Sequence, residues 1–108
     1  MKIENTDIVY AYVRFSDKSG GKSRPVLIFQ MPGYPLIAYK ITSRYDNKPD
    51  YLKRVFYEIK HWQEAGLRKK SWVDTAFKID MNRLQIVSIF GQLHIEDVIG
   101  LRDFINQL

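Results

Sequence analysis

Residues 25–30 read Pro25-Val26-Leu27-Ile28-Phe29-Gln30 and are apolar almost without interruption. A short apolar run of this kind predicts a β-strand that is buried on both faces. Residues 7–15 and 36–42 are rich in β-branched and aromatic side chains and predict strands on either side of it. A Gly-Gly turn within residues 16–23 and a Pro-Gly break at residues 31–35 separate the three segments. Connections this short predict antiparallel pairing.

The hydrophobic period changes after the third strand. Apolar residues then recur at steps of three and four, as on one face of a helix. These residues are Leu52, Val55, Phe56, Ile59 and Trp62. Pro49-Asp50 offers an N-cap before them and Gly66 a stop after them, so the pattern predicts a helix over residues 51–65. The apolar stripe places Trp62 in the core or against neighbouring elements.

The remaining sequence predicts short strands at residues 71–73 and 77–79, a weaker strand at residues 84–90, and a final helix over residues 95–106. His94 fits the N-cap of that helix, and Glu96 and Asp97 in its first turn suit the helix dipole. Gly100 lies inside the helix, where it suggests close packing. The order predicts a mostly β or α+β fold: one domain over residues 1–108, an antiparallel, partly closed barrel with helices at its side and end.

Composition excludes several classes of site. The chain has no cysteine, which excludes disulfides, thiolate metal sites and a cysteine nucleophile. His61 and His94 are far apart and lack partners at metal-ligand spacing, so we predict no metal site and no cofactor. The first residues lack an apolar leader, and no run approaches the length that spans a bilayer. We therefore expect a cytoplasmic protein that does not enter a membrane.

The net charge of +5 on 108 residues favours a polyanionic partner, and nucleic acid is the commonest one. Arg24 stands where a flexible loop enters the buried strand, and a guanidinium there suits two phosphate oxygens. Thr42 and Ser43 end the third strand, next to Arg44, and their hydroxyls could bind a phosphate. Taken singly, each residue is equally explained as an ordinary strand-end side chain.

Together, these motifs resemble the MazF/PemK toxins of bacterial toxin–antitoxin pairs. The resemblance runs from about Asp7 to Ile105 and rests on short motifs in a shared order. They are Asp7-Ile8-Val9, Ser23-Arg24-Pro25-Val26-Leu27-Ile28, Ile41-Thr42-Ser43, Ala65-Gly66-Leu67, Ser71-Trp72-Val73, Ile79-Asp80-Met81-Asn82-Arg83-Leu84 and Gly91-Gln92-Leu93.

The resemblance implies an SH3-like barrel with appended helices, a homodimer, and a cognate antitoxin that covers the RNA groove and often carries a DNA-binding part. It also implies a metal-independent endoribonuclease that cuts single-stranded RNA at short sequences. Arg24 and Thr42 fall on the catalytic arginine and threonine of the family. The 2′-hydroxyl would attack the phosphorus, with Arg24 stabilising its charge or assisting the leaving oxygen and Thr42 holding a non-bridging oxygen. The products would be a 2′,3′-cyclic phosphate and a 5′-hydroxyl.

The chain departs from the family pattern near residues 71–77. Asp74 falls on a carboxylate of some family members and is a candidate general base, whereas Trp72 stands where they have a second arginine. Lys40 or Lys78 could replace that charge. The residues expected to bind RNA are Lys22, Ser23, Lys40, Ser43, Arg44 and Lys78.

Two alternatives follow from the missing arginine. The chain could be a non-catalytic relative that grips another protein, or a basic barrel that binds nucleic acid in regulation. We expect neither His61 nor His94 to be catalytic.

Overall fold

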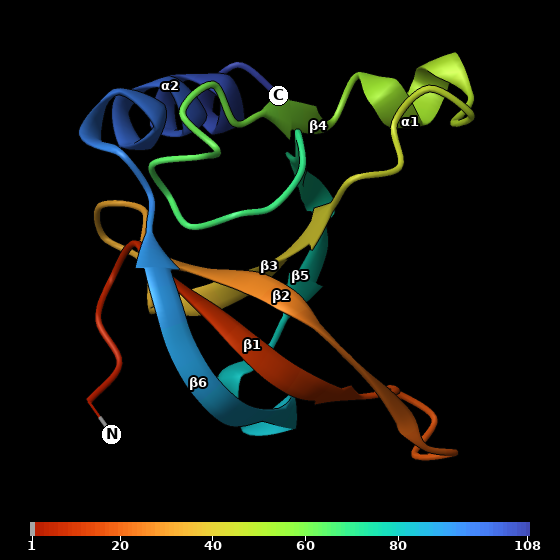
Figure 1. Cartoon of the computed structure of the whole chain (residues 1–108). Coiled ribbons are helices and arrows are strands. Elements are labelled where there is room, and N and C mark those ends of the chain that lie inside the picture. The colour runs from red at the N-terminus through yellow and green to blue at the C-terminus, as the bar shows by residue number, and fades with distance from the viewer. Residues whose placement is uncertain (1) are drawn as a thin grey trace.

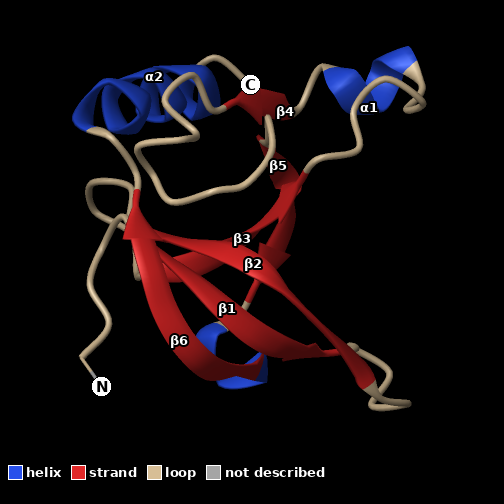
Figure 2. Ribbon diagram, in the orientation of Figure 1, coloured by secondary structure: helices blue, strands red, loops and turns tan. Residues whose placement is uncertain are grey.

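The computed structural model describes residues 2–108 and contains one six-stranded antiparallel sheet with two α-helices (Figures 1 and 2). The strands lie in the order β4-β5-β3-β2-β1-β6, with every pair antiparallel. Their bounds are β1 Asp7–Arg14, β2 Gly21–Phe29, β3 Ile37–Thr42, β4 Phe56–Glu58, β5 Trp72–Ile79 and β6 Leu84–Gln92. The helices are α1 Asp50–Lys53 and α2 Ile95–Asn106, and a 3-10 turn, η1 Met81–Arg83, precedes β6. The predicted antiparallel, barrel-like fold with a helix after the third strand and a C-terminal helix is confirmed.

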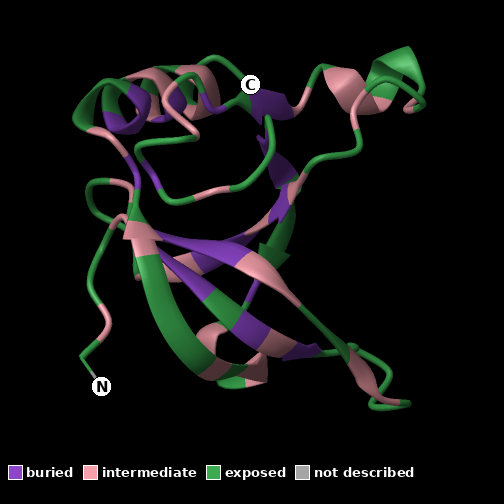
Figure 3. Ribbon diagram, in the orientation of Figure 1, coloured by how far each residue is buried: buried purple, intermediate pink, exposed green. Residues whose placement is uncertain are grey.

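Strand β2 lies inside the sheet and is buried on both faces at its C-terminal end, as its apolar run predicts (Figure 3). Leu27 and Phe29 point into a core that α2 covers, together with Val98 and Leu101 of the helix. Val26 and Ile28 point the other way, into a second core within the curl of the sheet. The members of the second core on neighbouring strands are Val9, Ala11, Val13, Ala38 and Ile79. One strand therefore ties two cores together.

The predicted helix over residues 51–65 is wrong beyond its first turn. It ends at Lys53, and Phe56 and Tyr57 instead enter strand β4, opposite Asp74 and Val73 of β5. An apolar period of three and four matched these residues, but pairing with an available sheet edge outweighed that local preference. Residues 59–71 then form turns beneath α2, where Trp62 packs against the first core. The predicted strands at residues 71–73 and 77–79 are parts of the single strand β5.

Helix α2 has the predicted bounds, and the predicted N-cap is confirmed: the backbone N–H of Glu96 donates to His94 Nδ1 at 3.1 Å. None of the helices in the described part of the chain is long and apolar enough to cross a membrane.

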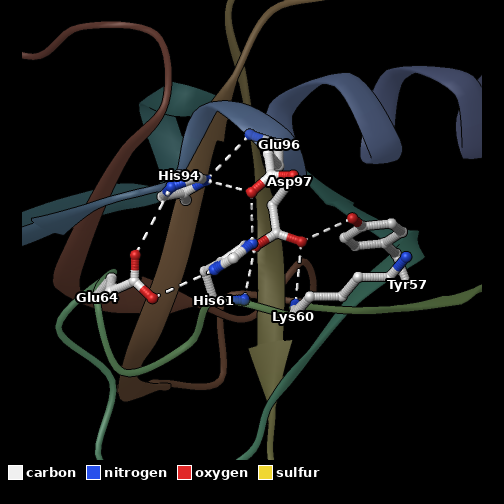
Figure 4. A network of polar contacts seen from close by, with 7 residues as sticks. All are labelled: Tyr57, Lys60, His61, Glu64, His94, Glu96 and Asp97. Carbon is white, nitrogen blue, oxygen red and sulfur yellow. Dashed lines mark hydrogen bonds and ion pairs between the residues drawn. The ribbon is translucent and has the colours of Figure 1, made fainter.

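A fully buried carboxylate, Asp97, joins α2 to the segment around β4 (Figure 4). Its Oδ1 accepts hydrogen bonds from the Tyr57 hydroxyl at 2.7 Å and from the Lys60 backbone N–H at 3.0 Å. Its Oδ2 accepts from the His61 backbone N–H at 2.9 Å. Burial, reinforced by Asp97, raises the pKa of Tyr57, so its hydroxyl stays protonated and donates. Asp97 therefore does more than complement the helix dipole.

We expect Asp97→Asn to destabilise the fold by roughly 3 kcal/mol, because it weakens three buried hydrogen bonds and sets an amide N–H₂ against an existing donor. Urea denaturation measures the change. Asp103→Ala, at an exposed site on the same helix, is the control and should alter stability by less than about 0.5 kcal/mol. A loss below about 1 kcal/mol for Asp97→Asn would contradict the role of Asp97 as a buried anchor.

Gly100 faces Tyr57 so closely that an added Cβ would collide with the Tyr57 hydroxyl oxygen. Helix propensity alone would make Gly100→Ala stabilising by about 1 kcal/mol. The collision reverses the sign, and we expect a loss of about 1–3 kcal/mol because the ring is already fixed by Asp97. A thermal melt distinguishes the two outcomes, and a raised Tm would show that the contact relaxes freely.

Candidate nucleic-acid interface

The pairing of β2, β3 and β5 brings the three predicted catalytic residues to one face of the sheet. Lys40 lies opposite Val26 of β2, and Arg24 is two residues before Val26, on the same face. On the other side, Lys40 lies opposite Asp74 of β5, and Thr42 lies opposite Trp72. This is the face of the second core, whose apolar residues end at Val26 and Ala38. Beyond that point the same strand faces carry cations and hydroxyls.

Two of these cations converge on one aromatic ring that the sequence did not single out. Arg24 Cζ lies 5.9 Å and Lys40 Nζ lies 5.3 Å from the centroid of the Phe77 ring. Both distances are within the range of cation–π attraction. Phe77 is 40% exposed, so its ring forms an accessible platform under two positive charges.

The pair is electrostatically costly. Burial lowers the pKa of Arg24, and among residues 2–108 its buried Nε has no hydrogen-bond partner. Burial also lowers the pKa of Lys40, and the neighbouring charge of Arg24 lowers it further, against the opposing effect of Asp74. Two half-buried cations side by side and an unpaired donor are unfavourable in the absence of an anion, and such arrangements concentrate at functional sites.

Thr42 and Asp74 complete this face. The Arg44 backbone N–H donates to Thr42 Oγ1 at 3.1 Å, which leaves the hydroxyl proton of Thr42 available as a donor. Asp74 is buried, and its Oδ1 accepts from the Ala76 backbone N–H at 3.1 Å, within the irregular part of β5. Its carboxylate therefore braces the strand and sets a negative charge beside Lys40.

Further aromatic rings on this face also carry cations. Tyr45 stacks on Trp72 with centroids 4.6 Å apart and planes 7° apart. Lys53 Nζ lies 5.0 Å from the Tyr45 ring, and Lys70 Nζ lies 5.6 Å from the Trp72 ring. Trp72, which stands where the family resemblance places an arginine, thus holds a positive charge through Lys70. We use the name cation face for the surface formed by four cations and three rings: Arg24, Lys40, Lys53, Lys70, Phe77, Tyr45 and Trp72.

The residues expected to bind RNA are divided between two faces. Lys22 precedes Arg24 by two residues and lies on its face, and its charge contributes to lowering the pKa of Lys40. Lys78 lies opposite Tyr39, which belongs to the first core, and is therefore on the reverse face. Ser23 alternates with Arg24 and lies on that reverse face too, opposite Tyr12, while Arg44 is an exposed loop residue.

Ser43 lies in a groove of about 750 Å³ on the reverse face. The groove is lined by Tyr10, Pro25, Ile41, Leu67, Arg68, Lys69, Ser71, Ser88 and Phe90 among others.

No protein-family model matches the chain, and no curated protein matches it.

If Arg24 serves a ligand rather than the fold, its removal should stabilise the free protein. We expect Arg24→Met to raise the free energy of unfolding by about 0.5–1 kcal/mol at low salt, because it removes an unpaired buried donor and a like charge beside Lys40. Urea denaturation of this variant and of Arg54→Met, at an exposed site, gives the comparison. A loss above about 1 kcal/mol would make Arg24 a structural residue.

Proposed function

We propose that this protein is a metal-independent endoribonuclease that cleaves single-stranded RNA at the cation face. The observation that carries the proposal is the convergence of Arg24 and Lys40 on Phe77, with Thr42 on the same face of the sheet. The resemblance of the sequence motifs to MazF/PemK toxins supports the same activity.

A nucleic-acid backbone suits this face chemically. Phosphates would neutralise the paired cations, and aromatic rings beside a track of positive charge are a common arrangement for single strands. A duplex would keep its bases stacked inside, whereas a single strand can present them to Phe77 or to the Tyr45–Trp72 pair.

RNA supplies its own nucleophile, so cleavage needs no metal-activated water. In the proposed step the 2′-oxygen bonds to phosphorus while the bond from phosphorus to the 5′-oxygen breaks. Asp74 takes the 2′-hydroxyl proton, Arg24 stabilises the charge on phosphorus, and Thr42 donates to a non-bridging oxygen. Lys40, whose lowered pKa makes it a stronger acid, gives a proton to the leaving 5′-oxygen. The products are a 2′,3′-cyclic phosphate and a 5′-hydroxyl.

The proposal extends to the biological setting. As in the toxins that the motifs resemble, the enzyme would act in the cytoplasm as a homodimer under control of a cognate antitoxin. The edge strand β6 exposes Val87 and Ile89, and Phe90 on its reverse face, and these apolar side chains at a sheet edge support association with a second copy or with such a partner.

A non-catalytic nucleic-acid-binding module is the second candidate function. It is favoured by one observation: the buried Asp74 carboxylate already accepts a hydrogen bond from the Ala76 backbone N–H, so one of its oxygens braces β5 and is not free for a 2′-hydroxyl. Such a module would bind the same strand at the same face and leave it intact.

The deciding experiment incubates the untagged protein with single-stranded RNA in EDTA. We expect cleavage to 2′,3′-cyclic phosphate ends, a loss of at least 100-fold for Arg24→Met, and little change for Arg54→Met. A DNA strand of the same sequence should bind but stay intact, because it lacks the nucleophile.

Two lysines on opposite faces provide a matched pair. Lys40→Met should weaken RNA binding and reduce the salt slope by about 0.7, whereas Lys78→Met should change both much less. Binding without cleavage by the folded protein would establish the second candidate. If the two lysine variants have equal effects on RNA binding, the RNA does not bind at the cation face, which would contradict both candidate functions.

A further inference from the structure

The two histidines that the sequence places far apart lie against each other in the structure. His61 follows β4, His94 caps α2, and their rings stack with centroids 4.0 Å apart and planes 23° apart (Figure 4). Glu64 and Glu96 contact both rings. Although they are distant in the sequence, the two histidines are neighbours in space, because pairing of β4 with β5 and the Asp97 anchor bring the segment that carries His61 to the start of α2. The prediction of no metal site stays a prediction.

The Glu64 carboxylate contacts one nitrogen of each histidine ring. Its Oε1 lies 3.2 Å from His61 Nδ1, and its Oε2 lies 3.6 Å from His94 Nε2. In the neutral tautomer that binds a metal through its other nitrogen, His61 Nδ1 donates to Glu64. The proton of a neutral His94 lies on Nε2, because its Nδ1 accepts the Glu96 backbone N–H. His61 Nε2 then has a free lone pair, whereas the lone pair of His94 Nδ1 is engaged by that N–H group. This is the arrangement in which an outer carboxylate orients metal-binding histidines.

Both of these nitrogens face Glu96, whose Oε1 lies 3.0 Å from His61 Nε2 and 3.9 Å from His94 Nδ1. The three ligand atoms all lie within 4.8 Å of one another. Tetrahedral ligands at zinc bond lengths are about 3.4 Å apart, a spacing that the two measured distances bracket. We propose that His61, His94 and Glu96 bind a divalent cation of the zinc class, with Glu64 orienting both histidines.

The chemistry of the contacts favours a cation at this point. His61 Nε2 and the Glu96 carboxylate lie 3.0 Å apart, so a positive charge at this position, either a proton on the ring or a metal ion bound by both groups, stabilises the pair. His94 Nδ1 also accepts the Glu96 backbone N–H, and metal binding would replace this one capping bond. The positive end of the helix dipole opposes the ion, while the carboxylates of Glu64, Glu96 and the underlying Asp97 offset it.

The ion would clamp the segment after β4 to α2. Asp97 already fixes the backbone of this segment through the Lys60 and His61 N–H groups, so little ordering remains when the metal binds. The histidine side chains are 30% and 28% exposed, which leaves room for a water as fourth ligand. The site belongs to the α2 side of the fold and needs nothing from the cation face, so it does not rest on the proposed ribonuclease activity.

The test uses the untagged full chain, stripped with EDTA and desalted. We expect one Zn²⁺ per chain by isothermal titration, a Tm that rises with zinc concentration, and a tetrahedral visible spectrum with Co²⁺. His61→Gln, His94→Ser and Glu96→Gln should each weaken zinc binding at least 100-fold; serine keeps the helix cap while removing the ligand. Glu64→Gln should weaken binding 10–100-fold.

Glu58→Gln, at an exposed glutamate on β4, is the matched control and should bind zinc like the wild type. Equal zinc affinity in His94→Ser and the wild type would overturn the assignment. So would a wild-type protein whose stability responds to pH but not to zinc, which would show that a proton occupies the position between His61 and Glu96.

Discussion

The packing of α2 on the irregular segment beneath it depends on the hydrogen bonds of one buried carboxylate, that of Asp97. Residues 59–71 have no regular structure, yet they cover the first core beneath α2. A loop in that position has backbone donors that water cannot satisfy. Asp97 accepts two of them and also fixes Tyr57, which packs edge-on against Phe104. One helix residue thus makes an irregular segment part of the core.

The irregular part of β5 has a comparable effect on the cation face. Between Tyr39 and Lys40 of β3, the pairing partner changes from Lys78 to Asp74. The intervening residues of β5 bulge from the ladder, and Phe77 among them reaches both Arg24 and Lys40. Asp74 stabilises the bulge through Ala76, so its carboxylate has a structural task wherever the chemistry takes place.

The sequence correctly predicts those parts of the fold whose hydrophobic pattern fits only one kind of element. The run through Phe29 is apolar on both faces, and α2 has a cap, a first turn of acids and a periodic stripe, so their bounds or burial agree with the prediction. Phe56 and Ile59 fit a helical stripe equally well, and only the presence of a free sheet edge settles them as strand and loop. That edge depends on contacts distant in sequence, which local patterns do not encode.

Thr42 is the last residue of β3, as predicted, whereas Arg24 is the fourth residue of β2, which begins at Gly21 within the predicted loop. Phe77 enters the site through a bulge, and His61 meets His94 through a tertiary anchor.

The two candidate sites differ in charge and therefore favour ligands of opposite charge. On the cation face, Arg24 and Lys40 are half-buried and lie close enough to repel each other, with Asp74 as an opposing charge, so an anion lowers the energy of the site. At the stacked histidines, two glutamates surround the two rings, so a positive charge stabilises that site instead. A metal ion drawn to Glu64 and Glu96 has no comparable attraction to the cation face, where it would meet like charge. The proposed phosphate chemistry at Arg24 and the proposed metal site at the start of α2 are therefore independent of each other.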